Sequence, residues 1–79
     1  MSRYTTGAIL LLLFAARLFA ESEGERLFKS NDPTSAIPIL ERELSSGIAS
    51  AAAYNYLGLS YYQTGQYDKS VATFERGLR

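Results

Sequence analysis

The sequence pattern of the chain recurs at an offset of about 34 residues, which aligns Gly24 with Gly58. At this offset Asn31, in a turn-forming segment, pairs with Gly65. A period of about 34 residues indicates a repeated supersecondary unit, in which each copy buries an apolar face against the next copy. The similar residues that pair in this way are Leu27 with Tyr61, Phe28 with Tyr62, Ile37 with Val71, Leu40 with Phe74, Glu41 with Glu75, Arg42 with Arg76 and Leu44 with Leu78.

The second copy of the repeat predicts two helices, near residues 51–63 and 67–78. Ser50 is suited to cap the first of them, because its hydroxyl can accept a bond from a free backbone N–H. Gly65 separates the two helices, since glycine adopts the left-handed conformation that ends a helix. Apolar residues recur at helical spacing in both segments. These stripes are Tyr54, Leu57, Gly58 and Tyr61 in the first helix, and Tyr67, Val71, Phe74 and Leu78 in the second.

The first copy follows the same plan and predicts helices near residues 22–30 and 33–45. Asn31 tolerates positive φ, Asp32 is suited to cap the next helix, and Pro33 fits its first position. Pro38 lies inside that helix, where it removes one N–H, so we expect a kink on the outward face with the helix continuing. The apolar stripe is Ile37, Leu40 and Leu44, and Gly47 ends the helix.

Tyr54-x2-Leu57-Gly58-x2-Tyr61 followed by Ser70-x3-Phe74 resembles the tetratricopeptide repeat, whose period has the same length. The departures are Tyr54 for the usual Trp, Ser70 for Ala and Gly77 for Ala. The resemblance is to an exported or membrane-anchored bacterial member of the family. It implies an all-α fold of antiparallel helical hairpins in a right-handed solenoid, with Gly58 packed against Ser70. In the weaker first unit the matching positions are Gly24, Ala36 and Leu40.

The resemblance also implies a binding groove, which the first helix of each unit lines in this family. Members that capture a C-terminal carboxylate line the groove with Lys, Arg and Asn, whereas here only Lys29 is basic, so we expect an apolar and aromatic groove. Tyr54, Tyr61 and Tyr67 are expected in the hairpin core, and Tyr56 and Tyr62 are the tyrosines expected at the surface. The groove positions carried over from the family are Glu25, Phe28, Lys29, Asn55, Tyr56, Leu59, Tyr62 and Gln63.

The first twenty residues differ in kind from the rest. A nine-residue apolar run from Ala8 to Ala16 follows a short polar start, and it is too short to cross a bilayer core of about 30 Å. It suits a secretory signal peptide cleaved after Ala20, although Leu18 and Arg17 fit that reading poorly. The alternatives are an uncleaved anchor that holds residues 8–20 at a membrane, and a buried helix of a soluble fold. An apolar N-terminal helix is expected in each case.

The residue content narrows the function. The chain has neither Cys nor His, and its eight basic and eight acidic residues are interspersed. We therefore expect no catalytic site, no metal or cofactor, and no nucleic-acid partner, so the protein is not expected to be an enzyme. The expected function is an exported, periplasmic scaffold of the cell envelope that binds another protein. The alternative is a structural segment of a longer solenoid or of a membrane-anchored enzyme.

The expected domain organisation is a leader (1–20), a first degenerate unit (21–50) and a second unit (51–79) that is truncated at its C-terminal end. Repeats of this kind leave one apolar face for a neighbour, and two units seldom suffice for stability. The part of the chain that follows the leader is therefore expected to be unstable as a monomer, and self-association is one way to cover the exposed face.

Overall fold

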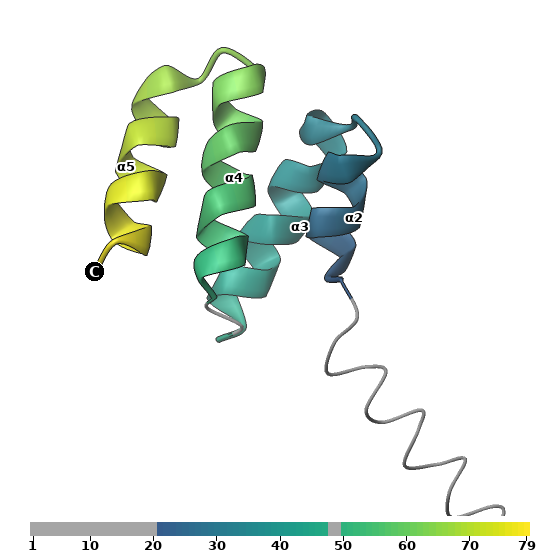
Figure 1. The fold of residues 1–79 in the computed structure, drawn as a ribbon, viewed down its shortest axis with the longest axis horizontal. Coiled ribbons are helices and arrows are strands. Elements are labelled where there is room, and N and C mark those ends of the chain that lie inside the picture. Colours follow the sequence, from purple (N-terminus) through teal and green to yellow (C-terminus); the bar gives the residue numbers. More distant parts are fainter. Residues whose placement is uncertain (1–20, 48–49) are drawn as a thin grey trace, which may run out of the picture.

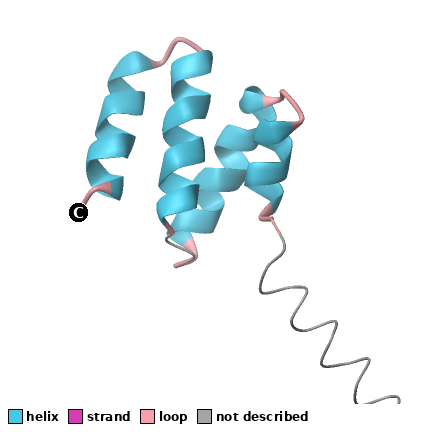
Figure 2. Ribbon diagram, in the orientation of Figure 1, coloured by secondary structure: helices cyan, strands magenta, loops and turns pink. Residues whose placement is uncertain are grey.

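The computed structural model describes residues 21–47 and 50–79, which form four α-helices joined by short turns (Figures 1 and 2). These are α2 (Glu23–Lys29), α3 (Pro33–Ser45), α4 (Ala51–Gln63) and α5 (Tyr67–Gly77). The described residues contain no strand, so the expectation of an all-α fold is confirmed. The apolar leader lies outside the described residues. Within these residues, no helix has both the length and the apolar character needed to cross a membrane.

The helix boundaries have local chemical causes. The hydroxyl of Ser50 accepts a bond from the Ala53 N–H at 3.0 Å, and the Asp32 carboxylate accepts one from Ser35 N–H at 3.2 Å. The hydroxyl of Ser22 caps α2 in the same way through Glu25 N–H at 3.1 Å. Each of these acceptors pairs with an N–H that has no partner inside the helix.

The turns use positive φ where the sequence indicated it. Asn31 has φ of 66°, and Gly65, at the matching position of the repeat, has φ of 80°. The residue after each of these positions closes the turn with a backbone hydrogen bond, from Asp32 N–H to Leu27 O and from Gln66 N–H to Tyr61 O. Helix α3 continues through the exposed Pro38.

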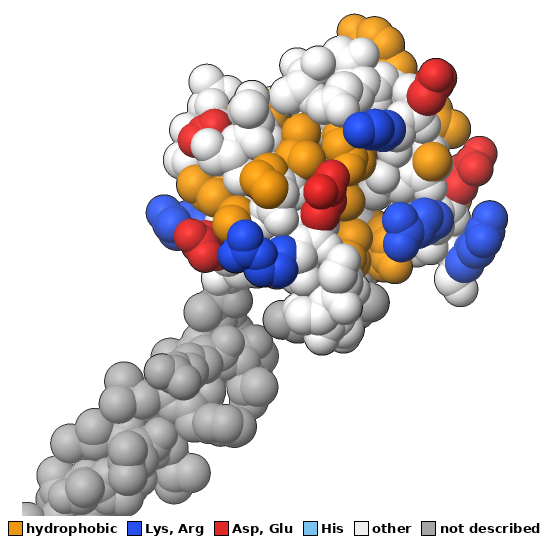
Figure 3. Space-filling view, turned by 180° about the vertical axis from the view of Figure 1, so that it is seen from behind, with side chains coloured by type: hydrophobic (Ala, Val, Ile, Leu, Met, Phe, Trp, Pro, Cys, Tyr) orange, Lys and Arg blue, Asp and Glu red, His pale blue; other side chains and the backbone are white. Residues whose placement is uncertain are grey.

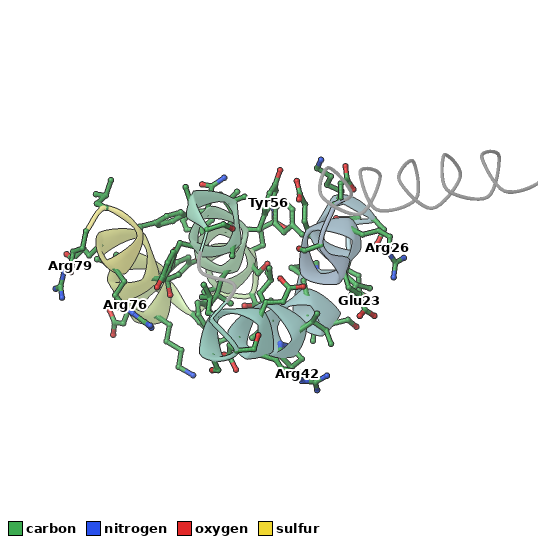
Figure 4. All side chains as sticks on the ribbon, turned by 90° about the horizontal axis from the view of Figure 1, so that it is seen from below. Glu23, Arg26, Arg42, Tyr56, Arg76 and Arg79 are labelled. Atoms are coloured by element: carbon green, nitrogen blue, oxygen red, sulfur yellow. The ribbon has the colours of Figure 1, made fainter. Side chains whose placement is uncertain are left out.

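The helices pack in chain order as two antiparallel hairpins, and α2 also contacts α4. We call α2 with α3 the first hairpin and α4 with α5 the second hairpin. Seen from below, α2 and α4 lie on one side of the molecule and α3 lies on the other (Figure 4). The buried cluster joins the two hairpins, because it consists of two residues of α3 and two of α4: Ala36, Leu40, Leu57 and Tyr61.

A glycine allows close approach within each hairpin. A Cβ built on Gly58 would lie 2.6 Å from the Phe74 ring, and one built on Gly24 would lie 2.5 Å from the Leu40 side chain. The contact expected between Gly58 and Ser70 is present, since the Ser70 hydroxyl donates to the Gly58 carbonyl at 2.7 Å. Both hairpins therefore depend on a position without a side chain.

The expectation that Tyr67 lies in the hairpin core was wrong, and within the apolar stripe of α5 Phe74 is the half-buried member that packs against Gly58 of α4. Tyr67 is 59% exposed, Val71 57% and Leu78 88%. Ser70 and Thr73 are instead the buried residues of α5, because they face α4. The three exposed members of the stripe lie at the end of the molecule where no described element follows α5 (Figure 1).

Candidate functional site

The groove positions of α4 form one face of that helix. Asn55, Leu59 and Tyr62 are three or four residues apart, so they lie one above another. Tyr56 and Gln63 flank them on the edge nearer α2. Asn55, Tyr62 and Gln63 are exposed, whereas Tyr56 and Leu59 are half-buried. An aromatic and amide-bearing surface is thus held on a rigid helix.

Tyr56 connects this face to α2. Its ring lies 5.2 Å from the Phe28 ring with an interplanar angle of 53°. The Lys29 ammonium lies 5.9 Å from the centre of the Tyr56 ring, within the range of a cation–π attraction. Figure 4 shows Tyr56 between α4 and α2 on the side of the molecule opposite to α3. The structure therefore brings together the predicted groove residues of α2 with Tyr56 of α4.

Lys29 is held by two carboxylates at this junction. Its Nζ lies 2.7 Å from Glu21 Oε1 and 3.3 Å from Glu25 Oε1. The hydrogen bond to Glu21, followed by the one to Glu25, raises the pKa of Lys29 above its ordinary value. The single basic group among the groove positions is thus already paired with two carboxylates.

Two other groove residues lie on the edge of α4 nearer α5. Tyr62 is 60% exposed and meets the Tyr67 ring at 5.3 Å in an edge-on arrangement. Asn55 borders an open hollow of about 400 Å³ between the start of α4 and the end of α5. The hollow is lined by Ala51, Ala52, Tyr54, Asn55, Phe74, Gly77 and Leu78. The predicted positions of α4 consequently extend from its α2 edge, with Tyr56 and Gln63, across Leu59 to its α5 edge, with Asn55 and Tyr62.

Sequence reasoning missed Tyr67 as a surface residue. It was placed in the core because it belongs to the stripe that contains Phe74. Tyr67 shares its exposure with Val71 and Leu78, and its ring meets that of Tyr62 at the edge of α4. Ala52 was also missed, although it is exposed one turn before Asn55 on the same face of α4.

The carboxylates of α3 serve the fold. Glu41 accepts a hydrogen bond from the Tyr61 hydroxyl, and Glu43 Oε1 accepts one from Gly24 N–H at 3.1 Å. Burial, followed by the hydrogen bond to Glu41, raises the pKa of Tyr61 from its ordinary value of 10 to about 12. The two carboxylates reach different helices, so they do not form a catalytic pair. On the face turned away from the viewer in Figure 1, acidic and basic side chains are interspersed (Figure 3).

Comparison with known families agrees with this geometry. Residues 51–79, which contain α4 and α5, match the sequence model of the tetratricopeptide repeat. No curated protein and no solved structure matches the chain at a significant level. The second hairpin, residues 51–79, is therefore a tetratricopeptide repeat.

Proposed function

We propose that the protein is an interaction scaffold of the cell envelope, which holds a partner peptide or helix in the groove formed by α2 and α4. A tetratricopeptide repeat is a module of protein–protein interaction, and the chain carries one at residues 51–79. The groove is part of a short right-handed solenoid built from the two hairpins. No cofactor or metal takes part, and the protein is not an enzyme.

The observation that carries this proposal is the exposure of the groove face. Tyr62 is 60% exposed, which places a large aromatic surface in contact with water, and Asn55 and Gln63 lie exposed beside it. Aromatic side chains with adaptable amide neighbours are enriched where proteins bind one another. Because Lys29 is paired with Glu21 and Glu25, the partner is recognised by apolar side chains and backbone amides.

Photo-cross-linking in cells that produce the full chain tests the groove. A photoreactive phenylalanine derivative replaces Tyr62 in one variant and Arg42 in the control, because Arg42 points away from the other helices on the outer side of α3 (Figure 4). We expect an adduct with another protein from position 62 and none from position 42. Adding Leu59→Arg at the centre of the groove should remove the adduct, because an apolar contact is replaced by a charge.

Two results would contradict the groove assignment. One is the same adduct from positions 42 and 62, and the other is an adduct at position 62 that survives Leu59→Arg. An adduct between two copies of the chain is distinguished by its mass, so self-association is not mistaken for capture of a partner.

The envelope location rests on the leader, which lies outside the described residues. We propose export with cleavage after Ala20, and, as the alternative, retention at the membrane through residues 8–20. N-terminal sequencing of the protein recovered from cells separates the two. A chain that begins at Glu21 supports cleavage, and a chain that retains Met1 supports an anchor.

A second function is favoured by the exposed stripe of α5. Val71 and Leu78 are 57% and 88% exposed, as expected if the hairpins are the structural start of a longer solenoid or of a membrane-anchored enzyme. In that case the groove has no role of its own. Leu59→Arg would then leave the activity and partners of the whole protein unchanged, whereas charges placed on α5 would disturb its folding.

A further inference from the structure

The two ends of the stacked hairpins present different surfaces. At the α2 end, the exposed side chains of Glu23 and Arg26 form an ion pair at 4.0 Å and point away from the other helices (Figure 4). At the α5 end, the exposed large hydrophobic side chains are Tyr67, Val71 and Leu78. One end is suited to water, and the other leaves apolar surface exposed, which is costly without a covering partner.

The internal repeat shows what kind of contact the α5 surface can make. Val71 and Leu78 occupy the same positions of the repeat as Ile37 and Leu44 of α3. Ile37 and Leu44 are half-buried and pack against the cluster that contains Leu57 of α4. The same positions that pack against a helix in the first hairpin are therefore covered by no helix of residues 21–47 and 50–79 in the second hairpin.

The α5 surface also carries a projection and a hollow at opposite ends. Tyr67, braced by Tyr62 at 5.3 Å, projects where α5 begins. The hollow of about 400 Å³ lies where α5 ends, lined by Tyr54, Phe74, Gly77 and Leu78 among others. Tyr67 and Leu78 are eleven residues apart, so at about 1.5 Å per residue the two features are separated by roughly 16 Å along the helix.

We propose that this surface binds a second copy of the chain, with the two α5 helices antiparallel about a two-fold axis near Val71 and Phe74. A two-fold interface uses the same patch on both copies, so it requires features that complement themselves. In this pairing each Tyr67 enters the hollow of the other copy. The site borders the groove on α2 and α4, because Asn55 lines the hollow and the Tyr62 ring contacts Tyr67.

The charges beside the stripe fit the same arrangement. Asp68 lies in the first turn of α5 and Arg79 two residues beyond its end, and both are exposed. Helical spacing continued over these eleven residues places the two side chains on the same side, about three turns apart. In an antiparallel pair, Asp68 of one copy meets the partner's Arg79, and the contact occurs twice. A head-to-tail chain of copies is disfavoured, because it would bury the Glu23–Arg26 ion pair against an apolar surface.

Cross-linking of two differently tagged full-length copies in the same cells tests the pairing, and the absence of native cysteine makes it clean. One copy carries Asp68→Cys and the other Arg79→Cys, which leaves the apolar stripe intact and preserves one of the two charge contacts. A bis-maleimide reagent that spans about 10 Å covers the distance between packed helices, but not the roughly 16 Å between identical positions. We expect a cross-linked dimer from the mixture and little from either variant alone.

The matched control is Ser35→Cys with Ser46→Cys, two exposed positions of the first hairpin at the same eleven-residue spacing. It should give no dimer. The antiparallel pairing is overturned if either single variant cross-links as well as the mixture, if the control cross-links equally, or if a ladder above the dimer forms. The pairing is also overturned if the mixture of Asp68→Cys and Arg79→Cys gives no cross-linked dimer.

Charge reversal gives an independent measurement on the purified full chain by sedimentation. Asp68→Arg alone and Arg79→Asp alone should each weaken the dimer by roughly tenfold in Kd, because like charges then face each other twice. The double variant, D68R with R79D, should restore the dimer. A double variant weaker than both single variants, or a wild-type chain that stays monomeric at every concentration, rejects the proposal.

Discussion

The two hairpins reach the same geometry with different chemistry at matching positions. In both, a glycine of the first helix faces a large side chain of the second, Gly24 with Leu40 and Gly58 with Phe74. The second hairpin adds a hydrogen bond from Ser70 to the Gly58 carbonyl, where the first has the fully buried Ala36. The two copies of the repeat thus share the packing of a glycine against a large side chain, while the polar contacts beside it differ.

The clearest difference concerns the length of the first helix. Gly58 lies inside the thirteen-residue α4, whereas Gly24 lies in the first turn of the seven-residue α2. The N–H of Gly24 therefore has no partner in its own helix, and the Glu43 carboxylate accepts its bond from α3. The position that corresponds to Glu43 in the second hairpin is Gly77, which lies against Tyr54. The short helix α2 is thus stabilised by the Glu43 carboxylate, whereas the longer α4 has the small Gly77 at the matching position of its partner helix.

The largest expected effect contrasts the two large side chains that face the glycines. Leu40 is fully buried and Phe74 is half-buried. Leu40→Ala should lower the free energy of unfolding by about 2–5 kcal/mol. Phe74→Ala should cost less, about 1–3 kcal/mol, because part of its ring is already in water. Urea unfolding followed by circular dichroism at one fixed concentration measures both, and equal costs would contradict the assigned burial.

Replacement of the glycines tests whether close approach matters equally in both hairpins. A side chain at Gly58 meets a ring and one at Gly24 meets a leucine, at 2.6 and 2.5 Å respectively. Gly58→Leu and Gly24→Leu should each cost about 1–3 kcal/mol through overpacking. Arg42→Leu, on an exposed position of α3, is the control and should change stability by less than about 0.5 kcal/mol. If Gly24→Leu is tolerated as well as the control, α2 does not pack as described.

Removal of the Glu43 side chain should affect the first hairpin alone. Glu43→Ala leaves the Gly24 N–H without its acceptor, which should cost about 1–3 kcal/mol. Glu43→Gln keeps an acceptor oxygen and should cost less. Amide chemical shifts provide the measurement, because residues of α2 should shift in both variants while those of α5 should not. Shifts spread evenly over both hairpins would argue against this capping role.

Exchanging Ser70 and Ala36, which occupy matching positions of the repeat, tests whether the two hairpins depend equally on a hydroxyl there. Ser70→Ala removes one buried hydrogen bond and should cost about 0.5–1.5 kcal/mol. If the repeat offset also matches the backbone acceptors, the hydroxyl of Ala36→Ser will bond to the Gly24 carbonyl as Ser70 does to Gly58. The variant should then cost less than an unpaired buried hydroxyl, about 1–3 kcal/mol. Thermal unfolding of the two variants decides whether the hairpins are equivalent at this level.

The last comparison concerns the alkaline pH dependence of stability that Tyr61 contributes from α4. Tyr61 pairs at the repeat offset with Leu27, which does not ionise. Because its pKa is raised in the folded chain to about 12, the unfolded chain loses this proton first. The stability that Tyr61 contributes is therefore complete below about pH 10 and lost as the pH rises from 10 to 12. Tyr61→Phe should flatten that part of the curve, measured as the midpoint of urea unfolding against pH.

The sequence predicted those features that depend on local spacing. Caps at Ser50 and Asp32 and positive φ at Asn31 and Gly65 follow from the chemistry of single residues, and the structure contains all four. The exposure of Tyr67 could not be predicted from its stripe, because burial depends on what lies beyond α5 rather than on α5 itself. The hydrogen bonds of Glu41 and Glu43 to other helices could not be predicted either. Helical spacing shows on which face of α3 each carboxylate lies, but not which atom of another helix it contacts. The groove positions came from the family resemblance, and their binding role stays a prediction.

The buried cluster has a consequence for the order in which the molecule opens. Its members come from α3 and α4, the half-buried residues packed on it come from α2, α3 and α4, and none comes from α5. The helices that should unfold together are therefore α2, α3 and α4, and this group does not coincide with either hairpin of the sequence repeat. We expect backbone amides of α5 to exchange with deuterium through local fraying, while those of α3 and α4 exchange only when the whole cluster opens. In the monomer, where no second copy covers α5, we therefore expect α5 to be the most labile described helix.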